Sequence, residues 1–155
     1  MSWSADPEFA ALFHAEMRER LGSLESGLME LEAHAGTAVP RDLLKPLQRD
    51  IHTVKGTARM AGADEVVATA HRLEDVLSAV ADGRVPISRL VVDVMLAAVS
   101  ALVRLLPGES APLAAGTLAD VTAALGGVLA GDDVVSAPSV RTDGPVVAAE
   151  PVAVG

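Results

Sequence analysis

Apolar side chains recur every three or four residues along most of this chain, which is the period of an amphipathic α-helix. The first run begins after Asp6 and Pro7, residues typical of a helix N-cap and first turn, and continues for about seven turns to Ala35 and Gly36. Its apolar positions are Phe9, Leu12, Phe13, Met17, Leu21, Leu24, Leu28 and Leu31. The pattern therefore predicts a long first helix with one apolar face.

Four more helices are expected from the same period and from the glycines and prolines that bound it. The second starts at Pro46, because proline costs about 3 kcal/mol inside a helix but is accepted in its first turn, and it ends at Gly62. The third follows Asp64 as its N-cap and runs to Ala81. The remaining two are expected over 86–106 and 112–130.

Short loops between long amphipathic helices favour antiparallel neighbours. The expected fold is therefore all-α, an antiparallel up-down four-helix bundle over residues 5–106 with an additional C-terminal helix within 107–130. After Gly131 the helical period stops and the composition shifts to Val, Ala, Pro, Ser and Gly, which predicts a flexible linker or tail over 131–155. With 155 residues, half of them apolar, the chain suits one compact domain.

The amino-acid composition indicates where in the cell the protein is expected to be located. The chain has no cysteine, so neither a disulfide framework nor a thiolate metal site is available, and this fits the reducing cytoplasm. It has no apolar run of about 18 residues and no signal-like start, in which a basic flank precedes an apolar core. We therefore expect a soluble cytoplasmic protein without a membrane partner.

The charge is distributed unevenly along the chain. A net charge of −9 argues against a nucleic-acid partner. Residues 1–40 carry seven acids against two arginines, whereas residues 41–60 carry five cations against two acids. These cations, called the basic strip below, are Arg41, Lys45, Arg49, Lys55 and Arg59. Taken alone the strip could be a solvated helix face, but beside the histidine described next it favours docking of a partner that carries acidic residues.

The segment from Pro46 to Gly62, considered as a helix, has two unlike faces. One face is apolar and consists of Leu47, Ile51, Val54, Ala58 and Ala61. The opposite face is polar and carries His52, Lys55, Gly56 and Arg59. Glycine inside a helix costs about 1 kcal/mol relative to alanine, so some other demand favours it one turn after an exposed imidazole. The missing side chain would let another protein approach His52, and Lys55 would reach an anionic group on that ring.

Three stretches of this chain resemble a known family. The run HTVKGTARMAG covers residues 52–62, HRLE covers 71–74, and FHAE at 13–16 leads into the Leu-rich first helix. Together they resemble the histidine-containing phosphotransfer (HPt) domains over roughly residues 5–106. The chain looks most like the N-terminal phosphotransfer domain of CheA-type chemosensory histidine kinases, including those that govern type IV pili. Gln48 departs from this pattern, because CheA proteins often have an aromatic residue there.

The resemblance implies a phosphorelay in a two-component, chemosensory system. A histidine kinase catalytic domain would phosphorylate His52, and a response-regulator receiver with its own Asp and Mg²⁺ would take the phosphoryl group. Attack on phosphorus needs a neutral imidazole with a free lone pair, and a carboxylate that accepts from Nδ1–H would leave Nε2 free. Glu74 is the candidate carboxylate, because the second and third helices should lie side by side and the family places a Glu there.

Other residues of the site receive supporting roles. Lys55 is expected to contact the phosphoryl oxygens. His71, three residues before Glu74, either supports the site or is only a packing residue. Gly56, Arg49 and Arg59 are assigned to partner docking.

The chain lacks the sequence features of an ATP-binding enzyme. It has no Gly-rich phosphate loop and no Asp/Asn cluster for Mg²⁺ of the kind that phosphoryl-transfer enzymes need. We therefore expect a phosphoryl carrier without a cofactor of its own, to which partner domains bring ATP and Mg²⁺. Such a domain could be the N-terminal part of a CheA-type kinase.

Two other functions are compatible with a helical bundle. One is an interaction scaffold that keeps the fold and never carries phosphate. The other is a metal-binding bundle in which His52, His71 and Glu74 converge. The metal hypothesis is disfavoured because the inward positions are aliphatic, whereas bundles that bind two metal ions need several more inward carboxylates.

Overall fold

The computed structural model describes residues 6–106, 113–132 and 136–140. Its elements are α1 (Pro7–Leu31), the short 3₁₀ helix η1 (Glu32–His34), α2 (Arg41–Met60), α3 (Asp64–Ala81), α4 (Arg89–Arg104) and α5 (Thr117–Ala130). The predicted all-α fold class is thus confirmed. Among the described residues, no helix is both long enough and apolar enough to cross a membrane.

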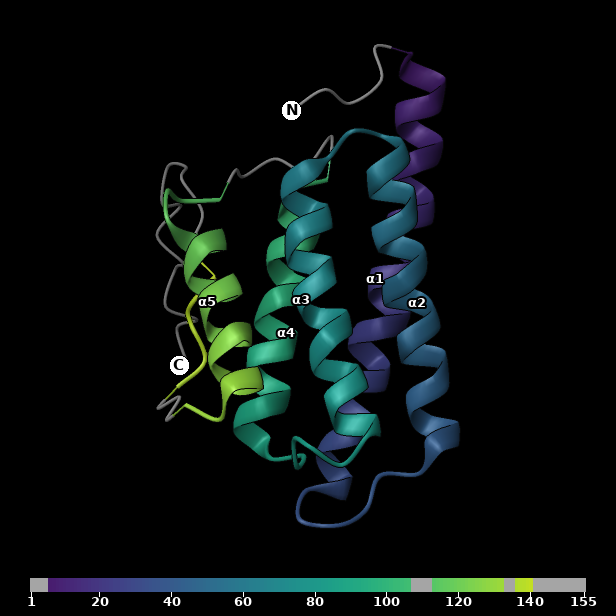
Figure 1. Ribbon diagram of the computed structural model, residues 1–155. Helices are drawn as coiled ribbons and strands as arrows, with labels where there is room; N and C mark the ends of the chain where they lie inside the picture. Colours follow the sequence, from purple (N-terminus) through teal and green to yellow (C-terminus); the bar gives the residue numbers. More distant parts are fainter. Residues whose placement is uncertain (1–5, 107–112, 133–135, 141–155) are drawn as a thin grey trace, which may run out of the picture.

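The first four long helices form an up-down bundle (Figure 1). Each packs against the next in the chain, and α1 also packs against α4, which closes the ring. The register between α1 and α2 follows from two contacts. Gly27 faces the side chain of Leu47, where an added Cβ would clash, and Arg20 reaches Asp50. The His-bearing helix α2 therefore lies between α1 and α3.

The bundle core is built mainly from aliphatic side chains at helical spacing. Most of the apolar positions expected for the first two helices are buried, because they face the centre of the ring. The buried members are Phe13, Met17, Leu21, Leu24, Leu28 and Leu31 of α1 and Leu47, Ile51, Val54 and Ala58 of α2. Burial of each large aliphatic side chain contributes about 1.5–3 kcal/mol to folding, so this stripe fixes how α2 is rotated.

The start of α2 differs from the sequence prediction. The helix begins at Arg41 with Pro40 as its N-cap, and Pro46 lies inside it. The prediction considered only the cost of an internal proline. In the structure the segment before Pro46 brings Leu44 into the core, where it is 2% exposed. Because burying a leucine contributes about 1.5–3 kcal/mol, it offsets a cost of similar size.

The other helix starts were also placed imperfectly. Asp64 is the first residue of α3 and not its cap, because Ala63 occupies the N-cap position without a side-chain hydrogen bond. Helix α4 begins after Ser88, whose Oγ accepts a hydrogen bond from the amide of Val91 at 3.1 Å, and not at 86. Helix α5 begins after Gly116, and the expected start at 112 lies outside the described residues.

Helix α5 packs against α3 and α4. Val121 and Leu125 are fully buried there, and the hydroxyl of Thr122 lies 3.2 Å from that of Thr69 on α3. The fifth helix therefore contributes side chains to the same hydrophobic core as the four-helix bundle. It is packed into the domain, whereas the sequence predicted only an additional C-terminal helix.

The expected tail is described only in part. Residues 131–132 and 136–140 form no helix, and Ala137 and Val140 are partly buried against the core. The remaining residues of 131–155 lie outside the described ranges. The flexible linker therefore stays a prediction.

Candidate functional site

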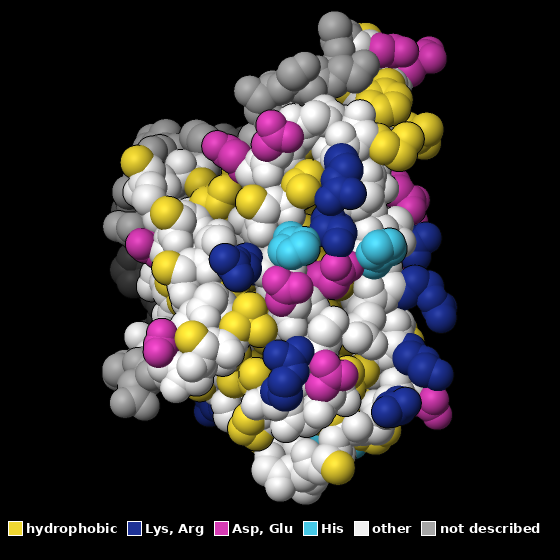
Figure 2. Space-filling model, viewed as in Figure 1, with side chains coloured by type: hydrophobic (Ala, Val, Ile, Leu, Met, Phe, Trp, Pro, Cys, Tyr) yellow, Lys and Arg dark blue, Asp and Glu magenta, His cyan; other side chains and the backbone are white. Residues whose placement is uncertain are grey.

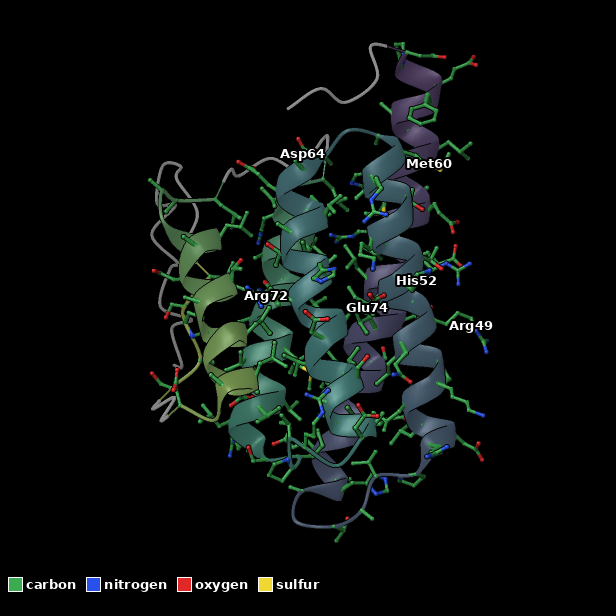
Figure 3. The ribbon with its side chains drawn as sticks, in the orientation of Figure 1. Arg49, His52, Met60, Asp64, Arg72 and Glu74 are labelled. Atoms are coloured by element: carbon green, nitrogen blue, oxygen red, sulfur yellow. The ribbon has the colours of Figure 1, made fainter. Side chains whose placement is uncertain are left out.

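His52 lies on the face of α2 that is turned away from the core. Its side chain is 74% exposed, whereas its neighbour Ile51 is fully buried. Figure 3 shows His52 on α2 beside Glu74 of the neighbouring helix α3. The imidazole is thus open to a partner while its helix is anchored by the core beneath it.

Glu74 joins the two helices at this point. Its Oε2 lies 2.9 Å from His52 Nδ1, and its Oε1 accepts a hydrogen bond from Lys55 Nζ at 2.6 Å. The side chains of Glu74 and Lys55 are only 20% and 11% exposed. One carboxylate therefore bridges the ring and the cation of α2 and limits the movement of both.

Burial and the neighbouring polar groups together determine the protonation state of the Glu74 carboxylate. Burial raises the pKa of Glu74, but the hydrogen bonds from Lys55 and His52, together with their charges, outweigh burial and lower the pKa overall. Glu74 is therefore ionised near neutral pH and acts only as an acceptor. In the neutral ring Nδ1 must then carry the proton that Glu74 accepts, which leaves the Nε2 lone pair free.

Gly56 has no structural need to be glycine. A Cβ built at this position would meet no atom within 4 Å, and the residue is not among the glycines with positive φ. The fold would accept alanine here and gain helix stability from it. The role of Gly56 in partner docking stays a prediction, and the open space beside His52 is the geometry that it requires.

His71 lies on α3 outside the His52, Glu74 and Lys55 cluster. Its side chain is 56% exposed and its Nε2 lies 3.4 Å from Asp75 Oδ2, one turn along the same helix. It is therefore a surface residue and not a packing residue. Among the described residues, no three His, Asp or Glu side chains gather closely enough to hold a metal ion, so His71 does not complete a metal site with His52 and Glu74.

Four of the five cations of the basic strip are exposed to solvent. Lys55 is drawn in toward Glu74, while Arg41, Lys45, Arg49 and Arg59 are exposed. Figure 3 shows Arg49 projecting outward from α2, and Figure 2 shows basic, acidic and histidine side chains together on the face that α2 and α3 form. The docking roles of Arg49 and Arg59 stay predictions.

Sequence reasoning missed the role of Asp50, which it counted only as one of the two acids of residues 41–60. Asp50 is 6% exposed and lies 3.5 Å from Arg20 Nη1, while Arg20 Nε donates to Glu16 at 3.1 Å. This bridge ties α1 to α2 two residues before His52. A signal was present, because Asp50 is adjacent to Ile51 and three residues from Leu47, which places it at the edge of the buried stripe.

The fold and the site define a helical domain that presents one exposed histidine, paired with a carboxylate, on the face that α2 and α3 form. The sequence model of the Hpt domain matches residues 8–105, and the chain belongs to this family of histidine phosphotransfer domains. The family resemblance inferred from the residues around His52 is thereby confirmed.

Relatives and a solved structure agree with this assignment. The chain is 35% identical over 89 residues to the chemotaxis protein CheA of Rhizobium meliloti (strain 1021) and 32% identical over 90 residues to the gliding motility regulatory protein of Myxococcus xanthus. These matches cover 57% and 58% of the chain but only 11% of each relative. The crystal structure of the phosphorylated P1 domain of CheA3 in complex with CheY6 from R. sphaeroides superposes with a TM-score of 0.67 at 29% identity, covering 80% of this chain and 97% of that one.

Proposed function

We propose that this domain accepts a phosphoryl group on Nε2 of His52 from a histidine kinase catalytic domain and passes it to an aspartate of a response-regulator receiver. The observation that carries the proposal is the pairing of His52 Nδ1 with the ionised Glu74 at 2.9 Å. This contact makes the outer nitrogen of an exposed ring the nucleophile.

The steps follow from the charges of the site. Nε2 attacks the γ-phosphorus of ATP held by the kinase, the N–P bond forms, and the bond to the ADP oxygen breaks. The ring keeps its proton on Nδ1 and becomes positive, so the Glu74 carboxylate stabilises the charge that develops. In the second transfer the receiver aspartate attacks phosphorus and the N–P bond breaks, which returns the neutral ring.

Lys55 has a second role in this scheme. Before transfer its ammonium is paired with Glu74 Oε1 at 2.6 Å. A phosphoryl group on His52 brings new anionic oxygens close to it, and charge-assisted hydrogen bonds to such oxygens are strong. We propose that Lys55 then contacts the phosphoryl group from its position one turn away on the same helix.

The partners are inferred from the relatives. The similar solved domain is phosphorylated and is in complex with CheY6, which supports a receiver as the acceptor. The chemotaxis and gliding-motility relatives support a chemosensory relay, and the cytoplasmic location stays a prediction. Because the chain spans 11% of their length, the kinase domain that supplies ATP and Mg²⁺ would belong to another part of such a protein or to another chain.

A labelling experiment tests this function. Incubation with a CheA-type kinase core and radiolabelled ATP is expected to give a phosphoryl adduct that is labile in acid, as a phosphoramidate should be, and that a cognate receiver removes. A domain that stays unlabelled with its own kinase would instead support the interaction scaffold.

Replacement of Glu74 by Gln tests the orienting role. The amide keeps the size of the side chain but loses the charge, and it can donate to Nδ1 and so favour the wrong tautomer. The rate of phosphorylation is expected to fall on the order of 10²-fold, the lower end of what positioned acid–base groups contribute. Single-turnover labelling measures this rate, and an unchanged rate would remove Glu74 from the mechanism.

Replacement of both Arg49 and Arg59 by Gln tests the basic strip. These exposed cations would act by long-range attraction of an acidic partner, which is screened over about 8–10 Å near physiological salt. The double variant is expected to associate more slowly and to show a flatter salt dependence. Transfer rates at two salt concentrations measure both effects. A wild-type salt slope would identify the strip as a solvated face.

A further inference from the structure

Helix α5 is apolar on all sides, although it lies at the edge of the domain. Asp120 is the one charged residue in its sequence, TLADVTAALGGVLA, and a helix of this kind is usually covered on every face. Its inner residues Val121 and Leu125 are fully buried against α3 and α4. Figure 1 shows α5 at the outer edge of the bundle, and its residues Ala119 and Ala123 are exposed. The outer surface of α5 is therefore suited to burial by a further segment.

An open apolar groove runs between α5 and α3. It consists of two adjoining hollows of about 590 and 430 Å³, which share Glu65, Leu118 and Ala119. Ala68 of α3 and Gly126 of α5 form part of its floor, and a Cβ added at Gly126 would meet no atom within 4 Å. Figure 2 shows hydrophobic side chains along α5 and the adjoining edge of α3. We call this hollow the α3–α5 groove, and it has room for an extended chain.

The α3–α5 groove lies on the flank of α3 that faces away from His52. Arg72 lines the groove, whereas Glu74 is paired with His52 at 2.9 Å. Figure 3 shows Arg72 and Glu74 on opposite sides of α3. A segment in the groove would thus leave the imidazole open to its partners.

The charges of the groove favour an occupant with an acidic residue. Arg72 is exposed, and no described residue forms an ion pair with it. Toward the other end, Glu65 and Arg104 both line the groove and offset each other. With two arginines against one glutamate, the described lining carries one net positive charge. A second copy of the chain would bring a net charge of −9, which opposes self-association through this face.

The chain after α5 folds back onto the domain. Gly131 ends the helix in the left-handed region, at a φ of 73°. Residues 136–140 then run beside α5 (Figure 1), and their side chains Ala137 and Val140 are partly buried against the core. The next segment, 141–155, therefore starts at the surface of the domain.

Residues 141–155 match the groove in composition and charge. Their sequence, RTDGPVVAAEPVAVG, contains seven Val and Ala residues and one cation against two acids. Glu150 stands between apolar neighbours, and Pro145 and Pro151 lower the cost of holding the segment extended. Glu150 follows Val140 by ten residues, which can span up to about 33–36 Å, whereas α5 is about 21 Å long. The segment is therefore long enough to cross α5 and reach the groove.

We propose that residues 141–155 dock in the α3–α5 groove of their own chain, with their Val and Ala side chains on its floor and Glu150 beside Arg72. The docked segment would take the place of the flexible tail that the composition predicts, and it would cover the apolar side of α5. This inference does not depend on the proposed function, because it concerns the flank of α3 that faces away from His52.

Paramagnetic relaxation in the full chain tests the proposal. The chain has no cysteine, so Ala153→Cys gives a single attachment point for a nitroxide spin label. The label is expected to broaden the amide signals of Ala68 and Ala123 in the groove. The signal of Arg49, on the outer side of α2, should stay sharp. Sharp signals at the groove residues would overturn the proposal.

Two matched glycine variants show whether the groove itself is occupied. Gly126→Leu fills the groove and should remove the broadening. Gly22→Leu is the control and should behave as wild type, because Gly22 is also a helical glycine at which an added Cβ meets no atom within 4 Å, but it lies on α1. Thermal unfolding checks that both variants fold. Broadening that persists in a folded Gly126→Leu would come from a free tail near α5 and would also overturn the proposal.

A charge exchange tests the contact between Glu150 and Arg72. Arg72→Glu should reduce the broadening about two- to fivefold, the effect of losing an exposed ion pair. Combining Arg72→Glu with Glu150→Arg should restore it, because the exchanged charges attract again. Wild-type broadening in Arg72→Glu, or no recovery in the double variant, would contradict the proposed contact.

Two further measurements separate docking within one chain from self-association. Spin-labelled protein mixed with isotope-labelled protein that carries no spin label should show no broadening in the groove, and broadening there would assign the groove to a second copy. Removal of residues 141–155 should lower the midpoint of thermal unfolding by about 2–8 °C. An unchanged midpoint would contradict the docking. None of these measurements involves phosphorylation, so their failure would leave the proposed function standing.

Discussion

Replacing His52 with Gln is expected to abolish acid-labile labelling of the domain by a kinase core and ATP. Glutamine has a similar polar surface but no basic ring nitrogen, so it offers no lone pair for attack on phosphorus. The change should leave the fold intact because the side chain is 74% exposed and its partner Glu74 keeps the hydrogen bond from Lys55. Labelling followed by acid treatment measures the loss.

His71 provides the matched control for this variant. It is also an exposed histidine on the same face, but its ring lies near Asp75 and not near the bridging carboxylate. His71→Gln is therefore expected to keep most of the label. Full labelling of His52→Gln would move the phosphorylation site elsewhere, and loss of the label in a folded His71→Gln would give His71 a direct part in the chemistry.

Gly56→Leu is expected to reduce phosphoryl transfer by about 10²-fold or more. Residue 56 is one turn after His52, so a leucine there would stand beside the imidazole and hold a docked partner away. A displacement of only about 1 Å in a reacting pair can cost about 10²-fold in rate. The domain itself should tolerate the change, because a side chain at this position begins in open space.

Gly56→Ala separates docking from folding. Alanine should raise the free energy of unfolding by about 0.5–1 kcal/mol, because glycine loses more conformational freedom in a helix. If Gly56 provides clearance, transfer should nevertheless slow in this more stable variant. Urea unfolding and rapid-quench transfer measure the two effects on the same samples. Wild-type transfer in the leucine variant would refute the docking role.

Much of the fold could be predicted because its determinants are local. The 3.6-residue period of α1 and the Asp6 side chain, which accepts from the amide of Glu8 at 3.0 Å, are visible in the sequence. The same period predicted that His52 faces solvent while Ile51 is buried, and the structure agrees. A helix face needs no knowledge of distant contacts, so these features follow from neighbouring residues alone.

The rest depends on contacts between helices. The start of α2 was misplaced because the burial of Leu44, which offsets an internal Pro46, is a property of the packed bundle. Lys55 was expected to contact phosphoryl oxygens on His52, but its pairing with Glu74 of another helix, which holds it at 11% exposure, was not predicted. The spacing of residues along one helix predicts which face a side chain occupies. It does not predict which residue of a neighbouring helix that side chain contacts.

The central claim is that Glu74 holds the neutral ring of His52 with its proton on Nδ1, so that Nε2 is the nucleophile. Nitrogen-15 NMR of the imidazole before and after phosphorylation tests it most directly, because the two ring nitrogens give separate signals. The account predicts an Nδ1–H tautomer in the free domain and a phosphoryl group on Nε2 in the product. A neutral ring protonated on Nε2, or a phosphoryl group on Nδ1, would contradict it.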